Sequence, residues 1–142
     1  MKNYLLFTLN FVFILLLTNA GHAQTGSYKD GTYKGKSRSI YVQEPYWGKV
    51  TVTVKGGKIA NVNFVVIDSS KNEEFDDKYE RYFAGNDNYV QQCRNDREGI
   101  KVYPNIVVEK QKLDEVDAIS GATWSYNLLK SSLKDALKDA KM

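Results

Sequence analysis

The chain has 142 residues, with 20 basic and 17 acidic side chains and a net charge of +3, a balance that gives no case for a nucleic-acid or polyanion partner. Its only histidine, His22, lies near the N-terminus, so the rest of the chain cannot build a Ser-His-Asp triad, a Cys-His pair or the usual zinc site. The only cysteine, Cys93, cannot form an internal disulfide, and we interpret it as a small, partly buried residue and not a nucleophile.

Residues 1–23 have the pattern of a secretory signal peptide: a weakly basic start, an apolar stretch and small residues before Gln24. The apolar run, residues 5–17, is shorter than the roughly 20 residues that span a bilayer, and an uncleaved anchor stays the alternative. Removing 23 of the 142 residues leaves 119, and the loss of Lys2 lowers the net charge from +3 to +2. The sequence therefore predicts one exported domain, residues 24–142, in the periplasm or cell envelope.

An exposed strand is predicted over residues 32–38, where polar or basic side chains alternate with an aromatic and small ones. Gly35 lies inside this stretch. A glycine within a strand marks either a bulge or the close approach of another backbone or a ligand, and we favour the bulge.

A β-hairpin is predicted around Gly56-Gly57. Valines alternate with polar residues over 50–55, the two glycines accept positive φ, and residues 58–67 return as a second strand. In the return strand Ile59 has the opposite parity to the later apolar residues, which predicts a bulge near Ala60-Asn61.

The middle of the chain gives weaker patterns. Residues 68–83 are predicted as one amphipathic helix, because aromatic residues recur at intervals of four and three: Phe75, Tyr79 and Tyr82. The turn at residues 85–88 would end this helix, and residues 89–97 would form a second short helical piece. Residues 100–108, interrupted by Pro104, are expected to form a loop or an edge strand.

A C-terminal helix is predicted after Thr123, since apolar residues fall at i, i+4, i+7, i+8 and i+11: Leu129, Leu133, Ala136, Leu137 and Ala140. The predicted fold class is α+β, a small antiparallel sheet covered by this helix and one or two others.

The segment before that helix, Asp117-Ala118-Ile119-Ser120-Gly121-Ala122-Thr123, has two interpretations. The first is helix-start chemistry, with Ser120 as the N-cap, Asp117 near the positive end of the helix, and Gly121 and Ala122 allowing a tight entry. The second is a phosphate site, because a helix N-terminus presents free N–H groups, and Thr123 would place its hydroxyl beside them.

These seven residues resemble the flavinylation motif of the FMN-binding domain family, which includes the flavin-carrying subunits of sodium-pumping NADH:quinone reductases and their Rnf-type relatives. The resemblance extends, in the same order, to other segments of the chain: Asp30 to Gly35, Gly48 to Val50, Gly57 to Val62, and Gln111. Residues 76–103 have no match in the family pattern.

The resemblance implies that a flavin transferase moves FMN from FAD onto Thr123 through a phosphoester bond. Asp117 would hold the loop or serve the transferase, and Ser120, Gly121, Ala122 and Trp124 would belong to the same FMN site. The chain would then be a stand-alone electron carrier between membrane and periplasmic redox partners, and an enzyme only if a substrate reacts directly at the flavin.

Aromatic residues near the motif and in the strands are candidates to stack on the flavin ring: Trp124, Tyr126, Tyr33 and Tyr46. Core packing is the alternative for each. Two other functions remain open at this stage: an exported module that binds FMN or another planar ligand non-covalently, and a structural or inhibitory domain without a cofactor.

Overall fold

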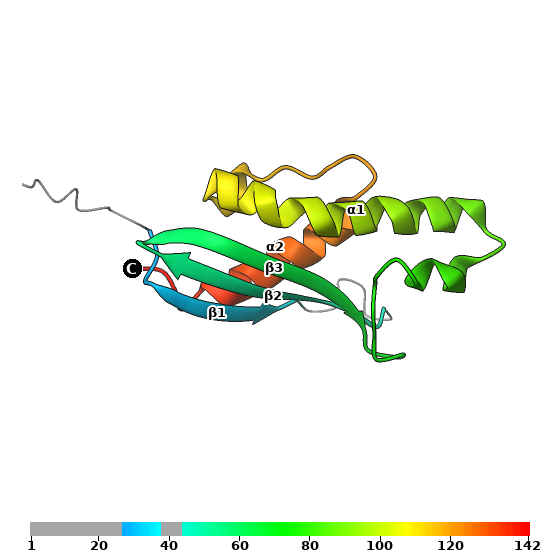
Figure 1. Ribbon diagram of the computed structural model, residues 1–142, viewed down its shortest axis with the longest axis horizontal. Helices are drawn as coiled ribbons and strands as arrows, with labels where there is room; N and C mark the ends of the chain where they lie inside the picture. Colours follow the sequence, from blue (N-terminus) through cyan, green and yellow to red (C-terminus); the bar gives the residue numbers. More distant parts are fainter. Residues whose placement is uncertain (1–26, 38–43) are drawn as a thin grey trace, which may run out of the picture.

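The computed structural model describes residues 27–37 and 44–142. Its strands are β1 (Gly31–Lys36), β2 (Tyr46–Lys55), β3 (Lys58–Asp68) and β4 (Glu73–Glu74); its helices are α1 (Asp87–Lys110) and α2 (Thr123–Leu137), with short 3-10 turns η1 (Tyr79–Phe83) and η2 (Leu113–Glu115). The strands form one antiparallel sheet in the order β1-β2-β3-β4, and the two helices pack against it (Figure 1). The α+β prediction is confirmed. The predicted signal peptide lies outside the described residues.

The predicted hairpin is present between β2 and β3. Gly56 and Gly57 have φ values of 59° and 72°, the left-handed conformation that a two-residue hairpin turn requires at both central positions. The carboxylate of Asp30 accepts hydrogen bonds from both glycine amides, at 2.9 and 2.8 Å. These backbone hydrogen bonds lower the pKa of Asp30.

The predicted bulge in β3 is also present. Thr53 pairs with Asn61 whereas Val54 pairs with Ile59, which leaves Ala60 as the extra residue. The bulge brings apolar residues from both sides of it onto one buried face. That face contains valines and aliphatic or aromatic residues of β2 and β3: Val50, Val52, Val54, Ile59, Val62, Phe64 and Val66.

Gly35 in β1 lies directly against the backbone of helix α2. The pairing of β1 with β2 runs without a register shift, so the bulge that we favoured at Gly35 is wrong. A Cβ atom at this position would lie 2.1 Å from the carbonyl oxygen of Ser132 and 2.4 Å from the amide nitrogen of Ala136. The glycine is needed because the backbone of α2 occupies the space that a side chain would take.

The predicted helix over residues 68–83 is wrong. The chain turns after β3, forms the short strand β4 and then the 3-10 turn η1. The turn is local: the Asp68 carboxylate accepts from the Ser70 amide at 2.8 Å, and Asn72 has a left-handed φ of 53°. Phe75 and Tyr79 are buried as their spacing indicated, but Phe75 lies in the loop after β4, whereas Tyr79 begins η1.

Helix α1 replaces three predicted pieces. Asn86, assigned to a terminating turn, is instead the N-cap, since its side chain accepts a hydrogen bond from the Tyr89 amide at 3.2 Å. The helix continues through Pro104, where a loop or edge strand was expected. A proline inside a helix costs roughly 3 kcal/mol, and buried contacts of the flanking residues, including Tyr103 and Val107, offset that cost.

Helix α2 confirms the predicted C-terminal helix, and its buried side runs from Ser125 to Leu137. It crosses β1 and β2, while α1 lies along β3 (Figure 1). Within the described part of the chain, no helix has both the length and the apolar character that a bilayer crossing requires.

Candidate functional site

Helix α2 begins at Thr123, the last residue of the motif, and this threonine is exposed. The N-cap residue is Ala122, which has no side chain able to cap. Ser120 is therefore not the cap that the sequence predicted, because it lies two residues before the N-cap position. Gly121, with a φ of 82°, makes the sharp entry between them.

The missing cap is supplied by Asp96 of helix α1. Its Oδ1 accepts from the Ser125 amide at 3.0 Å and from the Ser125 hydroxyl at 2.8 Å, and only 3% of the residue is exposed. A carboxylate at this place satisfies an amide of the first turn and lies at the positive end of the helix dipole. Gln92, one turn earlier on α1, donates to the other oxygen of Asp96 at 2.7 Å.

The loop that contains the motif is fastened to the same face of α1. The fully buried Tyr103 donates its hydroxyl hydrogen to the Ala122 carbonyl at 2.9 Å, and its oxygen accepts from the Ile119 amide at 2.9 Å. Gln92 donates to the Gly121 carbonyl at 2.8 Å. Gly99 allows the two helices to meet, since a Cβ there would lie 2.8 Å from the Ala122 Cβ.

The remaining motif residues differ in their exposure to solvent. Asp117 and Ser120 are exposed, and no hydrogen bond joins either side chain to another residue in the described ranges. Gly121 is half-buried and Ala122 is 1% exposed. The side chains of Thr123, Asp117 and Ser120 are thus accessible to solvent. The buried Ala122 is the residue through which this loop packs against α1.

A cavity of about 250 Å³ opens beside this helix start. Its wall is mainly aromatic, with contributions from Tyr46, Phe75, Phe83, Tyr89 and Trp124. The ring of Trp124 lies 5.2 Å from that of Tyr46, edge to face, and 5.2 Å from that of Phe75. Of the four aromatic residues predicted to meet a flavin ring, Trp124 and Tyr46 line this cavity, whereas Tyr33 and Tyr126 do not.

The polar residues in the wall of this cavity, which we call the aromatic pocket, are acidic or neutral: Glu44, Gln92, Cys93 and Asp96. Glu44 accepts a hydrogen bond from the indole N–H of Trp124 at 3.1 Å. Burial raises the pKa of the Cys93 thiol, which keeps it protonated and agrees with its interpretation as a packing residue.

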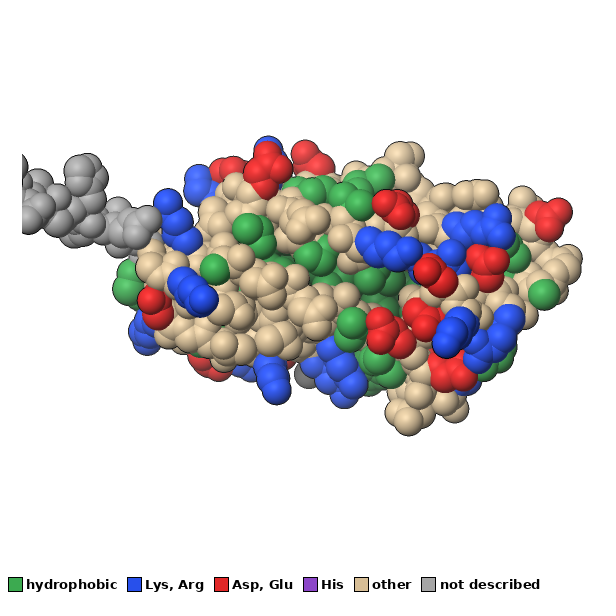
Figure 2. Space-filling view, viewed as in Figure 1, with side chains coloured by type: hydrophobic (Ala, Val, Ile, Leu, Met, Phe, Trp, Pro, Cys, Tyr) green, Lys and Arg blue, Asp and Glu red, His purple; other side chains and the backbone are tan. Residues whose placement is uncertain are grey.

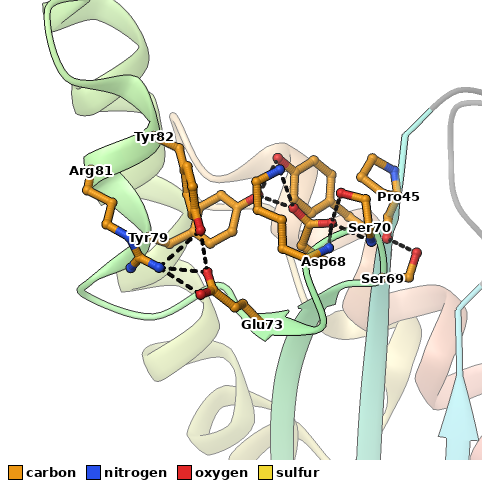
Figure 3. A network of polar contacts seen from close by, with 10 residues as sticks. Pro45, Asp68, Ser69, Ser70, Glu73, Tyr79, Arg81 and Tyr82 are labelled. Atoms are coloured by element: carbon orange, nitrogen blue, oxygen red, sulfur yellow. Dashed lines mark hydrogen bonds and ion pairs between the residues drawn. The ribbon is translucent and has the colours of Figure 1, made fainter.

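The buried carboxylate of Asp68 binds a chain of hydroxyl groups that begins with Tyr79 (Figure 3) and continues to Tyr46. Tyr79 donates to Asp68, and the hydroxyl oxygens of Tyr79 and Tyr46 are 3.1 Å apart. Burial acts to raise the pKa of Asp68, but hydrogen bonds from Ser70 and Tyr79 outweigh it and lower the pKa to about 2. Burial and the hydrogen bond to Asp68 raise the pKa of Tyr79.

Sequence reasoning missed the residues of α1 that hold the site. They lie in the segment without a family match, and they recur at helical spacing as a stripe of polar, glycine and aromatic residues: Gln92, Asp96, Gly99 and Tyr103. This i, i+4, i+7, i+11 pattern would have identified a functional helix face if one continuous helix had been predicted through Pro104.

These observations define a class of protein: a small α+β domain that presents an exposed threonine at a helix start beside an aromatic pocket. Residues 44–138 match the model of the FMN-binding domain, which is more than half of the chain, and the chain belongs to this family. FMN is therefore its cofactor, and the protein is a flavoprotein.

The fold is shared with a solved structure, the crystal structure of the CPE2226 protein from Clostridium perfringens. The identity is 25%, the TM-score is 0.55, and the match covers 79% of this chain and 88% of that one. A solution structure of a protein from Clostridium thermocellum is 23% identical, with a TM-score of 0.47, over 78% of this chain and 91% of that one. Comparison with curated proteins gives no match.

Proposed function

We propose that this protein is an exported electron carrier whose FMN is joined to Thr123 by a phosphoester bond. The observation that carries the proposal is the position of Thr123: an exposed hydroxyl at the first residue of α2, directly before a tryptophan that lines the aromatic pocket. Membership of the family identifies FMN as the cofactor. Thr123 is the motif hydroxyl that lies both at the helix N-terminus, which suits a phosphate, and next to the aromatic pocket, which suits a ring.

The helix start suits the phosphate of FMN. Helix geometry leaves the amides of Thr123 and Trp124 without intrahelical acceptors, and the helix dipole favours negative charge there. Asp96 binds the next amide, that of Ser125, from the side of α1 and leaves the exposed side of the first turn accessible. The glycine and alanine at positions 121 and 122 add little bulk to this approach.

The aromatic pocket suits the planar ring of FMN. Its volume of about 250 Å³ is a little below the roughly 300–1,000 Å³ of pockets that enclose whole drug-sized ligands. A pocket of this size fits the ring system alone, with the ribityl chain leading out to Thr123. When bound, FMN supplies the redox chemistry, while the protein attaches it, orients it and shields it from water.

The proposed role as an electron carrier rests on the covalent attachment of the flavin and on export of the protein. A covalent bond keeps the cofactor with a protein that works outside the cytoplasm, where lost FMN is not replaced. The proposed partners are a flavin transferase, which Asp117 would serve from its exposed position, and membrane or periplasmic redox proteins. Export rests on the signal-peptide pattern of residues 1–23.

Mass spectrometry of denatured protein, produced in a host with an active flavin transferase, tests the attachment. The wild type should carry one FMN, Thr123→Ala none, and Thr123→Ser and Ser120→Ala should retain it. The serine variant keeps an acceptor hydroxyl at the same place, and Ser120→Ala removes the neighbouring one. Flavin released on denaturation would instead support non-covalent binding, and colourless protein would support neither.

A further inference from the structure

The hydrogen-bond donors in the wall of the aromatic pocket are turned away from its interior. The indole N–H of Trp124 donates to Glu44, and the side-chain amide of Gln92 donates to Asp96 and to the Gly121 carbonyl. The Cys93 thiol is a weak donor. Two hydroxyl groups remain as possible donors to a ligand, that of Tyr89, which is 61% exposed at the rim, and that of Tyr46 in the wall.

The direction of the Tyr46 hydroxyl follows from the carboxylate behind it. Asp68 is fully buried and ionised, so it can only accept, and Tyr79 must give it its single hydroxyl hydrogen (Figure 3). The contact between the two tyrosine oxygens, at 3.1 Å, then requires Tyr46 to be the donor and Tyr79 the acceptor. The Tyr46 hydrogen thus lies between the two tyrosines and not in the pocket.

The charged residues around the pocket also disfavour an anionic ligand. Its lining includes the carboxylates of Glu44 and Asp96 and no lysine or arginine among the described residues. The nearby cations are engaged elsewhere: Lys71 lies 3.3 Å from Asp68, and Arg97, which contacts Cys93 from outside, pairs with acidic residues of the segment before α1. Tyr89, at the rim, is 61% exposed.

We propose that the Asp68–Tyr79–Tyr46 chain, by turning the Tyr46 hydrogen away, makes the aromatic pocket select a neutral planar ring over an anionic one. This inference rests on the proposed function, since the ring in question is that of FMN. Among the described residues, the wall has two carboxylates, no lysine or arginine, and no unengaged strong donor apart from the exposed Tyr89 hydroxyl at the rim. A negative charge on the ring therefore finds little inside the pocket to stabilise it. Tyr79 is therefore a positioning residue: it acts on the ring through Tyr46.

The selectivity has a measurable consequence for the reduction of bound FMN. Two electrons and two protons give a neutral reduced ring, whereas two electrons and one proton give an anionic one. The slope of midpoint potential against pH changes at the pH where the second proton is no longer taken up. A pocket that disfavours the anion moves this break to a higher pH than that of free FMN in the same buffer.

Spectroelectrochemistry of the FMN-loaded protein across pH tests the inference with three variants. Tyr79→Phe removes the acceptor of the Tyr46 hydrogen and frees it to enter the pocket. The break should then fall by about one pH unit, the size expected for a new hydrogen bond to an anion. Tyr46→Phe has no hydrogen to donate, so it should resemble the wild type, and the double variant should lose the shift seen in Tyr79→Phe.

The outcomes separate this inference from the proposed function. Three results would overturn the selectivity. The wild type could show its break at or below the pH of free FMN, or Tyr79→Phe could leave the break unchanged. The double variant could also show the same shift as Tyr79→Phe, in which case packing alone would explain the variants. If Tyr79→Phe does not fold, a shifted break in Tyr46→Phe still overturns the selectivity. If Thr123→Ala binds lumiflavin non-covalently, the aromatic pocket accepts the flavin ring without the phosphoester bond. If no sample contains flavin, both proposals are overturned.

Discussion

Two buried carboxylates flank the aromatic pocket, and they are stabilised in different ways. Asp96, on α1, is 3% exposed and binds the backbone and hydroxyl of Ser125 at the start of α2. Asp68, at the end of β3, is fully buried and binds Tyr79, Ser70 and the ammonium group of Lys71. Both carboxylates accept from a backbone amide and a hydroxyl, but Asp96 does so at the start of a helix, whereas Asp68 also binds the Tyr79 hydroxyl and one cation.

The difference indicates separate duties for the two sides of the pocket. The Asp96 side joins α1 to α2 and so decides where the helix that carries Thr123 begins. The Asp68 side joins β3 to the segment before α1 and fixes the orientation of the tyrosine hydroxyls next to the pocket. Breaking the first should cost mainly stability and flavin attachment together, while breaking the second should alter mainly the properties of the bound ring.

The largest effect is expected at Asp96. Asp96→Ala removes two hydrogen bonds and leaves the buried Ser125 amide without an acceptor, so the free energy of unfolding should fall by about 2–4 kcal/mol. Urea denaturation measures this change, and mass spectrometry should show reduced FMN attachment. Asp96→Asn is the matched control, because asparagine is also a good N-cap. A loss below about 0.5 kcal/mol in the alanine variant would contradict the capping role.

An acid-dependent effect is expected at Asp68. Its pKa in the folded protein is about 2, below the ordinary value of 3.8, so its ionised form favours folding. This contribution, about 2 kcal/mol, is complete above pH 4 and is lost as the pH falls towards 2. Unfolding free energies measured from pH 6 to pH 2 should therefore decline less steeply in Asp68→Asn. Parallel curves for the variant and the wild type would show that Asp68 is not the group responsible.

The smallest effect is expected in a surface cluster close to Asp68. Acidic and basic side chains are intermixed at the end of the molecule where η1 and the start of α1 lie (Figure 2). There Arg81 and Tyr82 both bond to Glu73, at 2.7 and 2.9 Å, but these residues are exposed or half-exposed (Figure 3). Glu73→Gln should leave stability within experimental error, because solvent screens exposed ion pairs. A marked loss would mean that this cluster supports the hydroxyl chain.

Local sequence patterns predicted the structure correctly where the residues that determine it lie within one short stretch of the chain. The Gly56-Gly57 turn, the bulge at Ala60 and the amphipathic helix α2 each depend on neighbours within a few residues, and all three are present. Between residues 68 and 110, the helical piece predicted over 89–97 is present as part of α1, but the segments on either side of it were mispredicted. The aromatic spacing of residues 68–83 fits a helix, while the Asp68 turn and the packing around Pro104 decide the outcome.

By itself, the sequence determined the fold class, the hairpin, the last helix and a motif that resembles flavin attachment sites, since these follow from periodicity, turn chemistry and seven consecutive residues. Only the tertiary structure decided that Ala122, and not Ser120, occupies the N-cap position, and that the Asp96 side chain supplies the capping hydrogen bond. It also decided which aromatic residues meet in a pocket. The physical reason is that a cap or a pocket wall is supplied by whichever side chain lies close in space, and α1 brings residues nearly 30 positions away to the start of α2.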